Sequence, residues 1–219
     1  LDIIGPPKLL KWLKVTSDLL QIGLTFPIRF TQAKPGALLR TEGFKVRAAN
    51  ALHSVEAYAY VVEERARPGV FYPEKAKKLG IPEGKLWSKL QKGRSVKVDG
   101  RIIEAALVTG PTRRGRKIGY SGDSRPAPRL ARFFSGCDLL IFDSTFSAKD
   151  KDRARERMHS TCVEAAQMAI NARVKRLVLT HFSARYTSPS VLVREARKFF
   201  PNTSAAADGL TLDVDYPSE

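Results

Sequence analysis

Short apolar runs alternate with amphipathic segments across residues 117–214, and this alternation limits the possible folds more than any other feature of the chain. Apolar strands are indicated at Lys117–Asp123, Leu139–Phe142 and Arg176–Thr180. Helices are indicated between and after these strands, at 129–134, 161–172 and 188–200. Strands that are apolar along their whole length belong to a sheet whose faces are covered, so the pattern predicts an α/β fold.

Local signals mark the starts of two of these helices. The segment Thr161-Cys-Val-Glu164 is a capping box, in which the first and fourth side chains bind backbone N–H groups at the helix start. Ser188 stands directly before Pro189, a residue that is favoured in the first turn of a helix. Further along, Leu210–Val214 is predicted to form the last strand.

The leading part of the chain is predicted to add further elements. Residues 1–5 are expected to form an apolar strand that runs into a turn, and the chain begins within it, so we expect a piece of a longer fold. A helix is predicted at 8–21, and a strand at 24–31 is confined by Pro27 to an edge or a bulge. Two adjacent strands are then expected at 44–48 and 56–63.

The segment 66–114 differs in character from the rest of the chain. It is rich in Pro and Gly, and it is predicted to hold two short helical pieces and a hairpin turning at Asp99-Gly100. Its apolar residues are few and scattered, which predicts an excursion from the main body without a core of its own. The excursion is rich in lysine, with Lys75, Lys77, Lys78, Lys85, Lys89, Lys92 and Lys97.

The charge balance indicates a polyanionic partner. The chain has 38 Lys and Arg against 22 Asp and Glu, a formal net charge of +16, which favours nucleic acid over an acidic membrane surface. No apolar run approaches the ~18 residues that a membrane-spanning helix needs. Two cysteines, Cys137 and Cys162, cannot form a disulfide framework and suit a reducing compartment, so a cytoplasmic location is expected.

Residues that can bind metal ions follow the apolar runs. Asp123, Asp143 and His181 each follow a predicted strand, His53 follows another apolar segment, and His159 precedes a helix start. Ligands of such sheets bind beyond the carboxyl ends of the strands, and imidazole with carboxylate suits a two-metal site for phosphoryl chemistry. Each residue taken alone also has a structural explanation, as a turn acid, a helix cap or a core histidine.

Several of these residues lie in motifs that occur in the same order in ribonuclease Z, the tRNA 3′-processing endonuclease of the metallo-β-lactamase superfamily. The chain resembles this family along nearly its whole length. A further segment, Leu79-Gly-Ile-Pro-Glu-Gly-Lys-Leu-Trp-Ser-Lys-Leu, resembles the family's flexible tRNA-binding arm. The ordered motifs are His53-Ser-Val-Glu-Ala-Tyr-Ala-Tyr, Tyr120-Ser-Gly-Asp-Ser-Arg-Pro, Leu140-Ile-Phe-Asp-Ser-Thr-Phe, Met158-His-Ser-Thr and Thr180-His-Phe-Ser-Ala-Arg-Tyr.

The resemblance implies a metallo-β-lactamase αββα sandwich over 1–219, amino-terminally incomplete, with a tRNA-binding arm inserted at 66–114. It also implies two metal ions, usually zinc. Asp123 matches the carboxylate that bridges them, and His53 and His181 each match a ligand of one metal. The pair of His159 and Asp143 resembles the group that protonates the leaving 3′ oxygen.

The resemblance also implies the substrate and the partners. The substrate would be precursor tRNA, cut after the discriminator nucleotide, and a second copy of the chain would complete a homodimer. Four residues are implied to contact the RNA: Ser183 and Arg185 near the scissile phosphate, and Lys85 and Lys89 in the arm.

The sequence departs from the family in its metal ligands. The superfamily's His-x-His-x-Asp-His motif has no counterpart here, and Asp143 stands where many members have Glu. A catalytic zinc usually has three protein ligands, whereas His53 and Asp123 offer two to one metal, and Asp123 and His181 offer two to the other. We therefore expect a missing amino-terminal segment to complete the site, and the isolated chain to lack part of it.

Two other functions fit some of these features. A non-catalytic RNA-binding relative that has lost the metal motif would keep the basic arm, but it would have no evident use for Asp123 or His159. A hydrolase of small esters or lactones is disfavoured by the net charge of +16 and by the arm. The nuclease is therefore the preferred interpretation.

Overall fold

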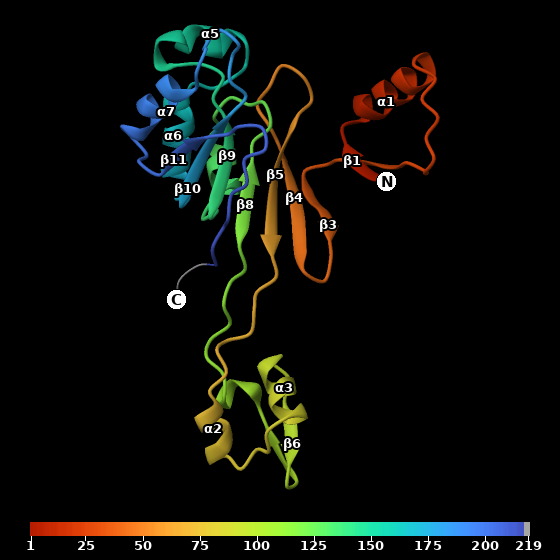
Figure 1. The fold of residues 1–219 in the computed structure, drawn as a ribbon, viewed down its shortest axis with the longest axis vertical. Coiled ribbons are helices and arrows are strands. Elements are labelled where there is room, and N and C mark those ends of the chain that lie inside the picture. The colour runs from red at the N-terminus through yellow and green to blue at the C-terminus, as the bar shows by residue number, and fades with distance from the viewer. Residues whose placement is uncertain (217–219) are drawn as a thin grey trace. The chain divides into compact units, whose positions relative to one another are not determined.

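The computed structural model of the chain describes residues 1–216. Backbone contacts divide it into two compact units. The first, which we call the body, consists of Leu1–Glu63 and Arg116–Asp215. The second, which we call the arm, consists of Glu64–Gly115 together with Tyr216, and the segment 66–114 lies within it (Figure 1).

A seven-stranded sheet forms the centre of the body, with the strand order β11-β10-β9-β8-β5-β4-β3. Its second half is parallel, since β8 pairs with β9, β9 with β10 and β10 with β11 in the same direction. The strands β5 and β8 pair antiparallel, as do β3 and β4. In chain order the strands are β3 (Gly36–Arg40), β4 (Phe44–Asn50), β5 (Tyr58–Glu64), β8 (Lys117–Tyr120), β9 (Leu139–Asp143), β10 (Arg176–Thr180) and β11 (Thr203–Ala205).

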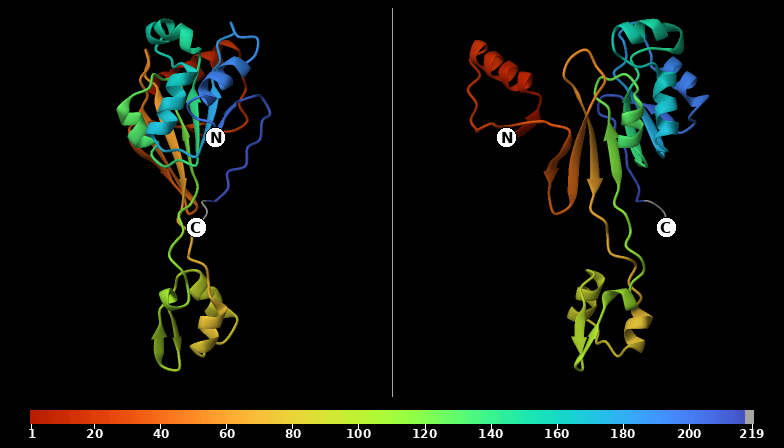
Figure 2. Two further views of the ribbon diagram at one scale, coloured as in Figure 1. Left: turned by 90° about the vertical axis from the view of Figure 1, so that its left-hand side faces the viewer. Right: turned by 180° about the vertical axis from the view of Figure 1, so that it is seen from behind.

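Helices pack against the parallel half of this sheet (Figure 2). The main core joins the sheet to α6 through fully buried side chains such as Phe142 and Leu177. At Gly119 a Cβ atom would lie 2.6 Å from the ring of Phe134, so the close contact between strand and helix layer requires glycine. The helices of the body after β8 are α4 (Pro128–Phe133), α5 (Lys151–Glu156), α6 (Cys162–Asn171) and α7 (Ser190–Arg197), with a 3₁₀ turn at Ala148–Asp150.

The predicted capping box is present at the start of α6, and the predicted start of α7 is displaced by one residue. Thr161 Oγ1 accepts the N–H of Glu164 at 3.1 Å, and the Glu164 carboxylate accepts the N–H of Thr161 at 2.9 Å, so both halves of the capping box form. Ser188 Oγ accepts the N–H of Ser190 at 3.2 Å, but α7 begins at Ser190 with Pro189 at its N-cap, so Pro189 lies just before the helix and not in its first turn.

The prediction of a strand at Leu210–Val214 is wrong. The last strand among residues 1–216 is β11, and the pairing ends just beyond it, where the N–H of Ala206 donates to the carbonyl oxygen of Leu179. Residues 210–214 pair with no strand in the described part of the chain, and Leu210 is 47% exposed. Alternating apolar residues were not sufficient, because a strand also needs a neighbour for its backbone groups.

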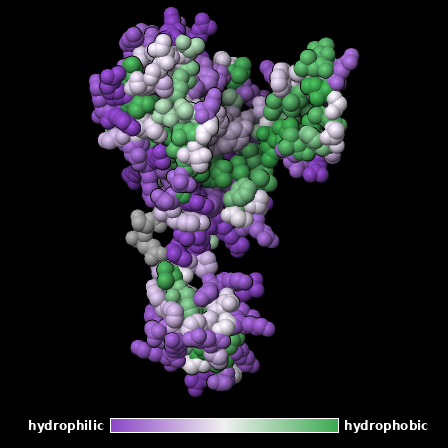
Figure 3. All heavy atoms as spheres, in the orientation of Figure 1, coloured by the Kyte–Doolittle hydropathy of each residue, from purple (hydrophilic) through white to green (hydrophobic). Residues whose placement is uncertain are grey.

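The leading segment forms a smaller layer of the body. β1 (Asp2–Gly5) and β2 (Arg29–Gln32) pair in parallel, and α1 (Pro7–Leu19) lies between them in the chain. The strand predicted at 24–31 begins only after Pro27, which cannot donate to a ladder. The helix α1 has no buried residue, Trp12 is 60% exposed, and apolar side chains gather on its surface (Figure 3).

The arm has a core of its own, which corrects the expectation that it would have none. Its elements are α2 (Pro73–Lys78), α3 (Lys85–Gln91), β6 (Val96–Val98), β7 (Arg101–Ile103) and a 3₁₀ turn at Ala105–Leu107. The predicted hairpin is present, with Asp99 and Gly100 at φ 46° and 80° between β6 and β7. The buried apolar cluster of the arm is formed by Ala76, Ile81, Leu90, Val96, Ile103, Ala105 and Val108.

No helix within residues 1–216 combines the length and the apolar character needed to cross a membrane.

Candidate functional site

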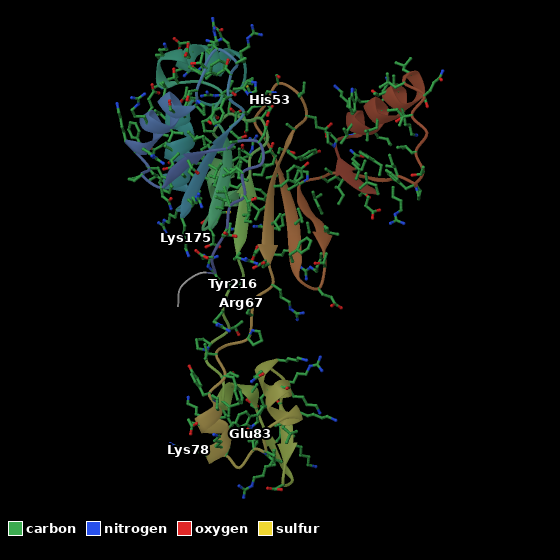
Figure 4. The ribbon with its side chains drawn as sticks, viewed as in Figure 1. His53, Arg67, Lys78, Glu83, Lys175 and Tyr216 are labelled. Carbon is green, nitrogen blue, oxygen red and sulfur yellow. The ribbon has the colours of Figure 1, made fainter. Side chains whose placement is uncertain are left out.

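Residues from five separate segments meet at the carboxyl edge of the parallel strands, one of them being His159 in the loop before α6. Asp143 ends β9, His181 directly follows β10, and Asp123 follows β8 by three residues. His53 comes from the loop after β4 and lies at one end of the sheet, whereas Lys175, just before β10, lies at the other (Figure 4). Because parallel strands end at the same edge, residues far apart in the sequence are brought together there.

The histidine rings and Asp123 form one cluster. The ring centroids of His53 and His159 are 4.9 Å apart, and those of His159 and His181 are 4.8 Å apart with the rings stacked. His181 Nε2 lies 3.4 Å from Asp123 Oδ2. The possible ligand atoms of His53, Asp123 and His159 all lie within 4.8 Å of one another, as do those of Asp143, His159 and His181.

The buried carboxylate of Asp143 is hydrogen-bonded to one member of this cluster. Asp143 is fully buried, and its Oδ2 atom lies 2.8 Å from His159 Nδ1. The same carboxylate accepts the N–H groups of Ser124 and Thr145, both at 3.0 Å, and that of Ser160 at 3.4 Å. The aspartate therefore reaches His159 although it is one methylene shorter than glutamate.

Hydrogen bonds orient two of the imidazoles. The carbonyl oxygen of Met158 can only accept, so the contact of 2.9 Å to His53 Nδ1 places the proton on Nδ1 and leaves the Nε2 lone pair free. Asp143 likewise accepts from Nδ1 of His159. Second contacts of this kind set the orientation of histidines in metal sites and in acid–base catalysis.

Strained backbone surrounds the cluster. His181 has φ 62° and Met158, next to His159, has φ 59°, values in the left-handed region that non-glycine residues seldom adopt. Gly122, before Asp123, has φ 58°, and a Cβ atom there would approach Tyr58 O at 3.0 Å. Such conformations are concentrated at functional sites, where the surrounding structure holds them in place.

An ion pair between Arg125 and Glu164, which no pattern in the sequence predicts, holds the loop of His159. Arg125 donates to the carbonyl oxygen of His159 at 2.8 Å and to both carboxylate oxygens of Glu164, at 2.9 and 2.5 Å. Glu164 is also the fourth residue of the capping box, so the start of α6 and the loop that carries His159 share one carboxylate. Each partner lies in a sequence motif, since Arg125 follows Ser-Gly-Asp-Ser and Glu164 closes the capping box at Thr161, but neither motif indicates that the two side chains meet.

The two candidate phosphate-binding residues of the body lie beside each other. Arg185 Nε donates to Ser183 Oγ at 3.1 Å, and its guanidinium lies 5.1 Å from the centroid of the Phe146 ring. An Arg185 N–H group also lies 3.5 Å from Asp150. The hydroxyl of Tyr186 donates to Asp150 and holds the pKa of that carboxyl below its usual range. Arg185 is therefore held by one charged partner on an accessible surface.

Lys85 and Lys89, the other two candidates for RNA binding, belong to the arm. Both lie on α3, Lys85 as its first residue and Lys89 in its last turn.

The side chains at the site are of the types that bind divalent metals, but there are too few of them to give each of two metal ions its usual number of protein ligands. His53 and His181 offer imidazole nitrogens, and Asp123 offers a carboxylate that is 41% exposed at its side chain, so all three face an accessible region. Zinc takes these ligand types. If Asp123 bridged two ions, each would have two donors from this set, one fewer than a catalytic zinc usually has.

Comparisons with known proteins identify the family of the chain. The sequence profile of the "Beta-lactamase superfamily domain" matches residues 97–182. The chain is 44% identical over 214 residues to a ribonuclease Z of Nitrosopumilus maritimus, covering 98% of this chain and 72% of the relative. It is 39% identical over 220 residues to a ribonuclease Z of Methanosarcina acetivorans, covering 100% of this chain and 72% of that relative.

Solved structures show the same fold. The crystal structure of the short form of human tRNase Z superposes with a TM-score of 0.62 at 22% identity, covering 98% of this chain and 68% of that one. A metallo-β-lactamase fold protein of Bacillus subtilis superposes with a TM-score of 0.58 at 17% identity, covering 94% and 62%. With this fold, and with sequence relatives matched over nearly its full length, the chain belongs to the ribonuclease Z family of the metallo-β-lactamase superfamily.

Proposed function

We propose that this chain is the larger part of a metal-dependent endoribonuclease that removes the 3′ trailer from precursor tRNA by cutting after the discriminator nucleotide. The observation that carries the proposal is the meeting of His53, Asp123 and His181 with the hydrogen-bonded pair of Asp143 and His159 at one sheet edge. The 44% identity to a ribonuclease Z supports the choice of reaction. Zinc is the proposed metal, because the donors are imidazole and carboxylate.

In this mechanism His53, Asp123 and His181 would hold the metal ions. When bound, divalent ions supply Lewis-acid stabilisation of the scissile phosphate and activate the attacking water. The chain's own acid is His159, which gives a proton to the departing 3′ oxygen. Asp143 accepts from His159 Nδ1 at 2.8 Å, so it orients the ring toward the departing oxygen.

The remaining candidates would bind the RNA backbone. Arg185 offers a planar guanidinium beside the site, suited to bidentate contact with a phosphate, and Ser183 adds a hydroxyl at 3.1 Å from it. Lys85 and Lys89 would contact tRNA phosphates from the arm, which fits recognition of folded RNA by shape and backbone. A homodimer and a cytoplasmic location are further parts of the proposal.

The shortage of donors leads us to infer that a segment outside this chain completes the metal site. The test is a trailer-cleavage assay with precursor tRNA and zinc, using the chain alone and the chain mixed with a leading segment that carries His-x-His-x-Asp-His. We expect cleavage only in the mixture. His159→Asn should reduce it by about 10²–10⁴-fold, the usual contribution of a general acid.

The second candidate function, a non-catalytic RNA-binding relative, predicts a different outcome. In that case the mixture binds precursor tRNA but never cuts it. If the chain alone instead binds two zinc ions tightly, the inference of a donor shortage is wrong.

A further inference from the structure

Thr145, which the preceding roles leave unused, lies between the two functional parts of the site. Its Oγ1 atom is 2.8 Å from Asp143 Oδ1 and 2.8 Å from His181 Nδ1. Asp143 belongs to the proposed proton-donating pair, whereas His181 belongs to the proposed metal ligands. Thr145 is 6% exposed, so its hydroxyl is largely shielded from bulk water.

The directions of these hydrogen bonds follow from the donors available. A threonine hydroxyl has one hydrogen to donate and two lone pairs. The carboxylate of Asp143 is surrounded by donors, including the backbone N–H groups of Ser124 and Thr145, and offers only lone pairs in return. The hydroxyl hydrogen of Thr145 therefore goes to Asp143, and a lone pair of Oγ1 faces His181. Consequently the ring proton of His181 is on Nδ1.

This assignment determines what His181 presents to the metal region. With the proton on Nδ1, Nε2 carries a lone pair that faces Asp123 Oδ2 at 3.4 Å. Two acceptor atoms that face each other at this distance favour a cation between them. In the opposite tautomer Nε2 of His181 would carry the proton and donate it to Asp123, so this nitrogen would have no lone pair left to bind a metal ion.

We propose that Thr145 is a positioning residue that selects the metal-binding tautomer of His181 and joins it to the His159–Asp143 pair through one carboxylate. The hydrogen-bond chain runs from His181 Nδ1–H to Thr145, from the Thr145 hydroxyl to Asp143, and ends where Asp143 accepts from His159. This inference deepens the proposed function and rests on it for the meaning of the metal-binding tautomer.

The backbone makes Thr145 a fixed point for this role. Its N–H donates to Asp143 Oδ1 at 3.0 Å, and its carbonyl accepts the N–H of Ser183 at 3.2 Å. Thr145 thereby holds the loop after β10, in which His181 adopts its left-handed conformation. A residue that only filled space would need neither hydroxyl contact.

The test reads tautomers directly by long-range ¹H–¹⁵N NMR of the full chain. The chain has only three histidines, so each ring can be resolved. Spectra are recorded without metal at about pH 8.5, where an ordinary imidazole is neutral. In the unsubstituted protein we expect His181 to carry its proton on Nδ1. Thr145→Val should shift His181 toward the opposite tautomer, and Thr145→Ser should restore the original state.

His53 is an internal control, because Met158 and not Thr145 fixes its tautomer. The proposal is overturned if His181 in the unsubstituted protein carries its proton on Nε2, or if Thr145→Val leaves its tautomer unchanged. The first measurement needs no variant, so the proposal stays testable even if Thr145→Val fails to fold; Thr145→Ala then replaces it.

A second readout separates this inference from the proposed function. In the cleavage mixture we expect Thr145→Val to lower kcat by about 10–100-fold and Thr145→Ser to stay near the original rate, the usual range for partners of metal ligands. If the unsubstituted mixture never cuts RNA, the proposed function fails while the tautomer result stands. If it cuts and Thr145→Val cuts equally well, the positioning role fails alone.

Discussion

The body and the arm differ in the size of their cores and in the side chains that each unit displays. The body buries a large cluster around Phe142 and Leu177, and at its sheet edge histidine and aspartate side chains lie 2.8 and 3.4 Å apart. The arm buries a much smaller cluster around Leu90 and carries lysines on its surface. Cleavage of RNA, the proposed task of the body, needs reacting groups held at fixed distances. Contacts to phosphates, the proposed task of the arm, tolerate looser placement of the side chains. The larger core therefore belongs to the unit whose task needs the more precise geometry.

The largest expected effect tests the body. Phe142→Ala removes a fully buried ring and should lower the free energy of unfolding by about 3–5 kcal/mol. Urea denaturation measures the change. Trp12→Ala is the matched control, because Trp12 is 60% exposed and should change stability by about 0.5 kcal/mol or less. Equal losses for both variants would show that the core does not hold the body together.

The next effect should stay within the arm. Leu90 is fully buried there, and Leu90→Ala should cost about 2–5 kcal/mol of local stability. Amide hydrogen exchange should become faster for residues 64–115 and remain slow in the strands of the body. Lys89→Ala, one residue earlier on the same helix, is the control. Faster exchange throughout the body would mean that the two units unfold as one.

Alkaline pH should destabilise the body through its cysteines. Burial raises the pKa of Cys137 to about 11 and that of Cys162 to about 12. Because an unfolded thiol ionises near pH 8.5, this contribution to stability is present below that pH and is lost as the pH rises. The loss approaches about 1.4 kcal/mol per pH unit for each thiol.

Urea denaturation at about pH 8 and pH 9.5 measures this loss. The double variant Cys137→Ala, Cys162→Ala should lose less stability over that interval than the unsubstituted chain. The arm contains no cysteine, so its hydrogen exchange should not respond through this route. A pH dependence that is unchanged in the double variant would rule out the thiols as its cause.

A smaller effect is expected at the edge of the site. Arg125→Ala removes the partner of Glu164 and of the His159 carbonyl, and should cost about 1–3 kcal/mol. Denaturation gives the cost, and NMR line broadening of His159 would report the loosened loop. Arg129→Ala is the control, since its bonds to Asn50 and Ala51 are exposed and 3.4 to 3.5 Å long.

The smallest change in stability is expected on the arm surface. Lys85→Ala with Lys89→Ala should leave unfolding within about 0.5 kcal/mol. Binding of precursor tRNA should weaken, and the dependence of log K on log salt should become shallower by up to about 2 units, one for each lost phosphate contact. An unchanged salt dependence would place the RNA elsewhere.

Much of the fold was predictable because its signals are local. The strands ending near Asp143 and Thr180, the capping box at Thr161 and the hairpin at Asp99-Gly100 each depend on a few neighbouring residues, and all are present. The strand expected at Leu210–Val214 is absent, because its formation depended on a partner strand that no local pattern specifies. The arm's core was missed for the same reason, since its apolar residues are scattered in the chain and gather only after folding.

The candidate site divides in the same way. The sequence by itself determined which residue types stand after each strand, and the order of its motifs identified the family. Only the tertiary structure decided that Thr145 is hydrogen-bonded to both Asp143 and His181, and that Arg125 donates to the carbonyl oxygen of His159. The physical reason is that a hydrogen bond depends on distance and direction in space. Periodicity and spacing along a chain carry that information only within a turn or a strand, not across a sheet.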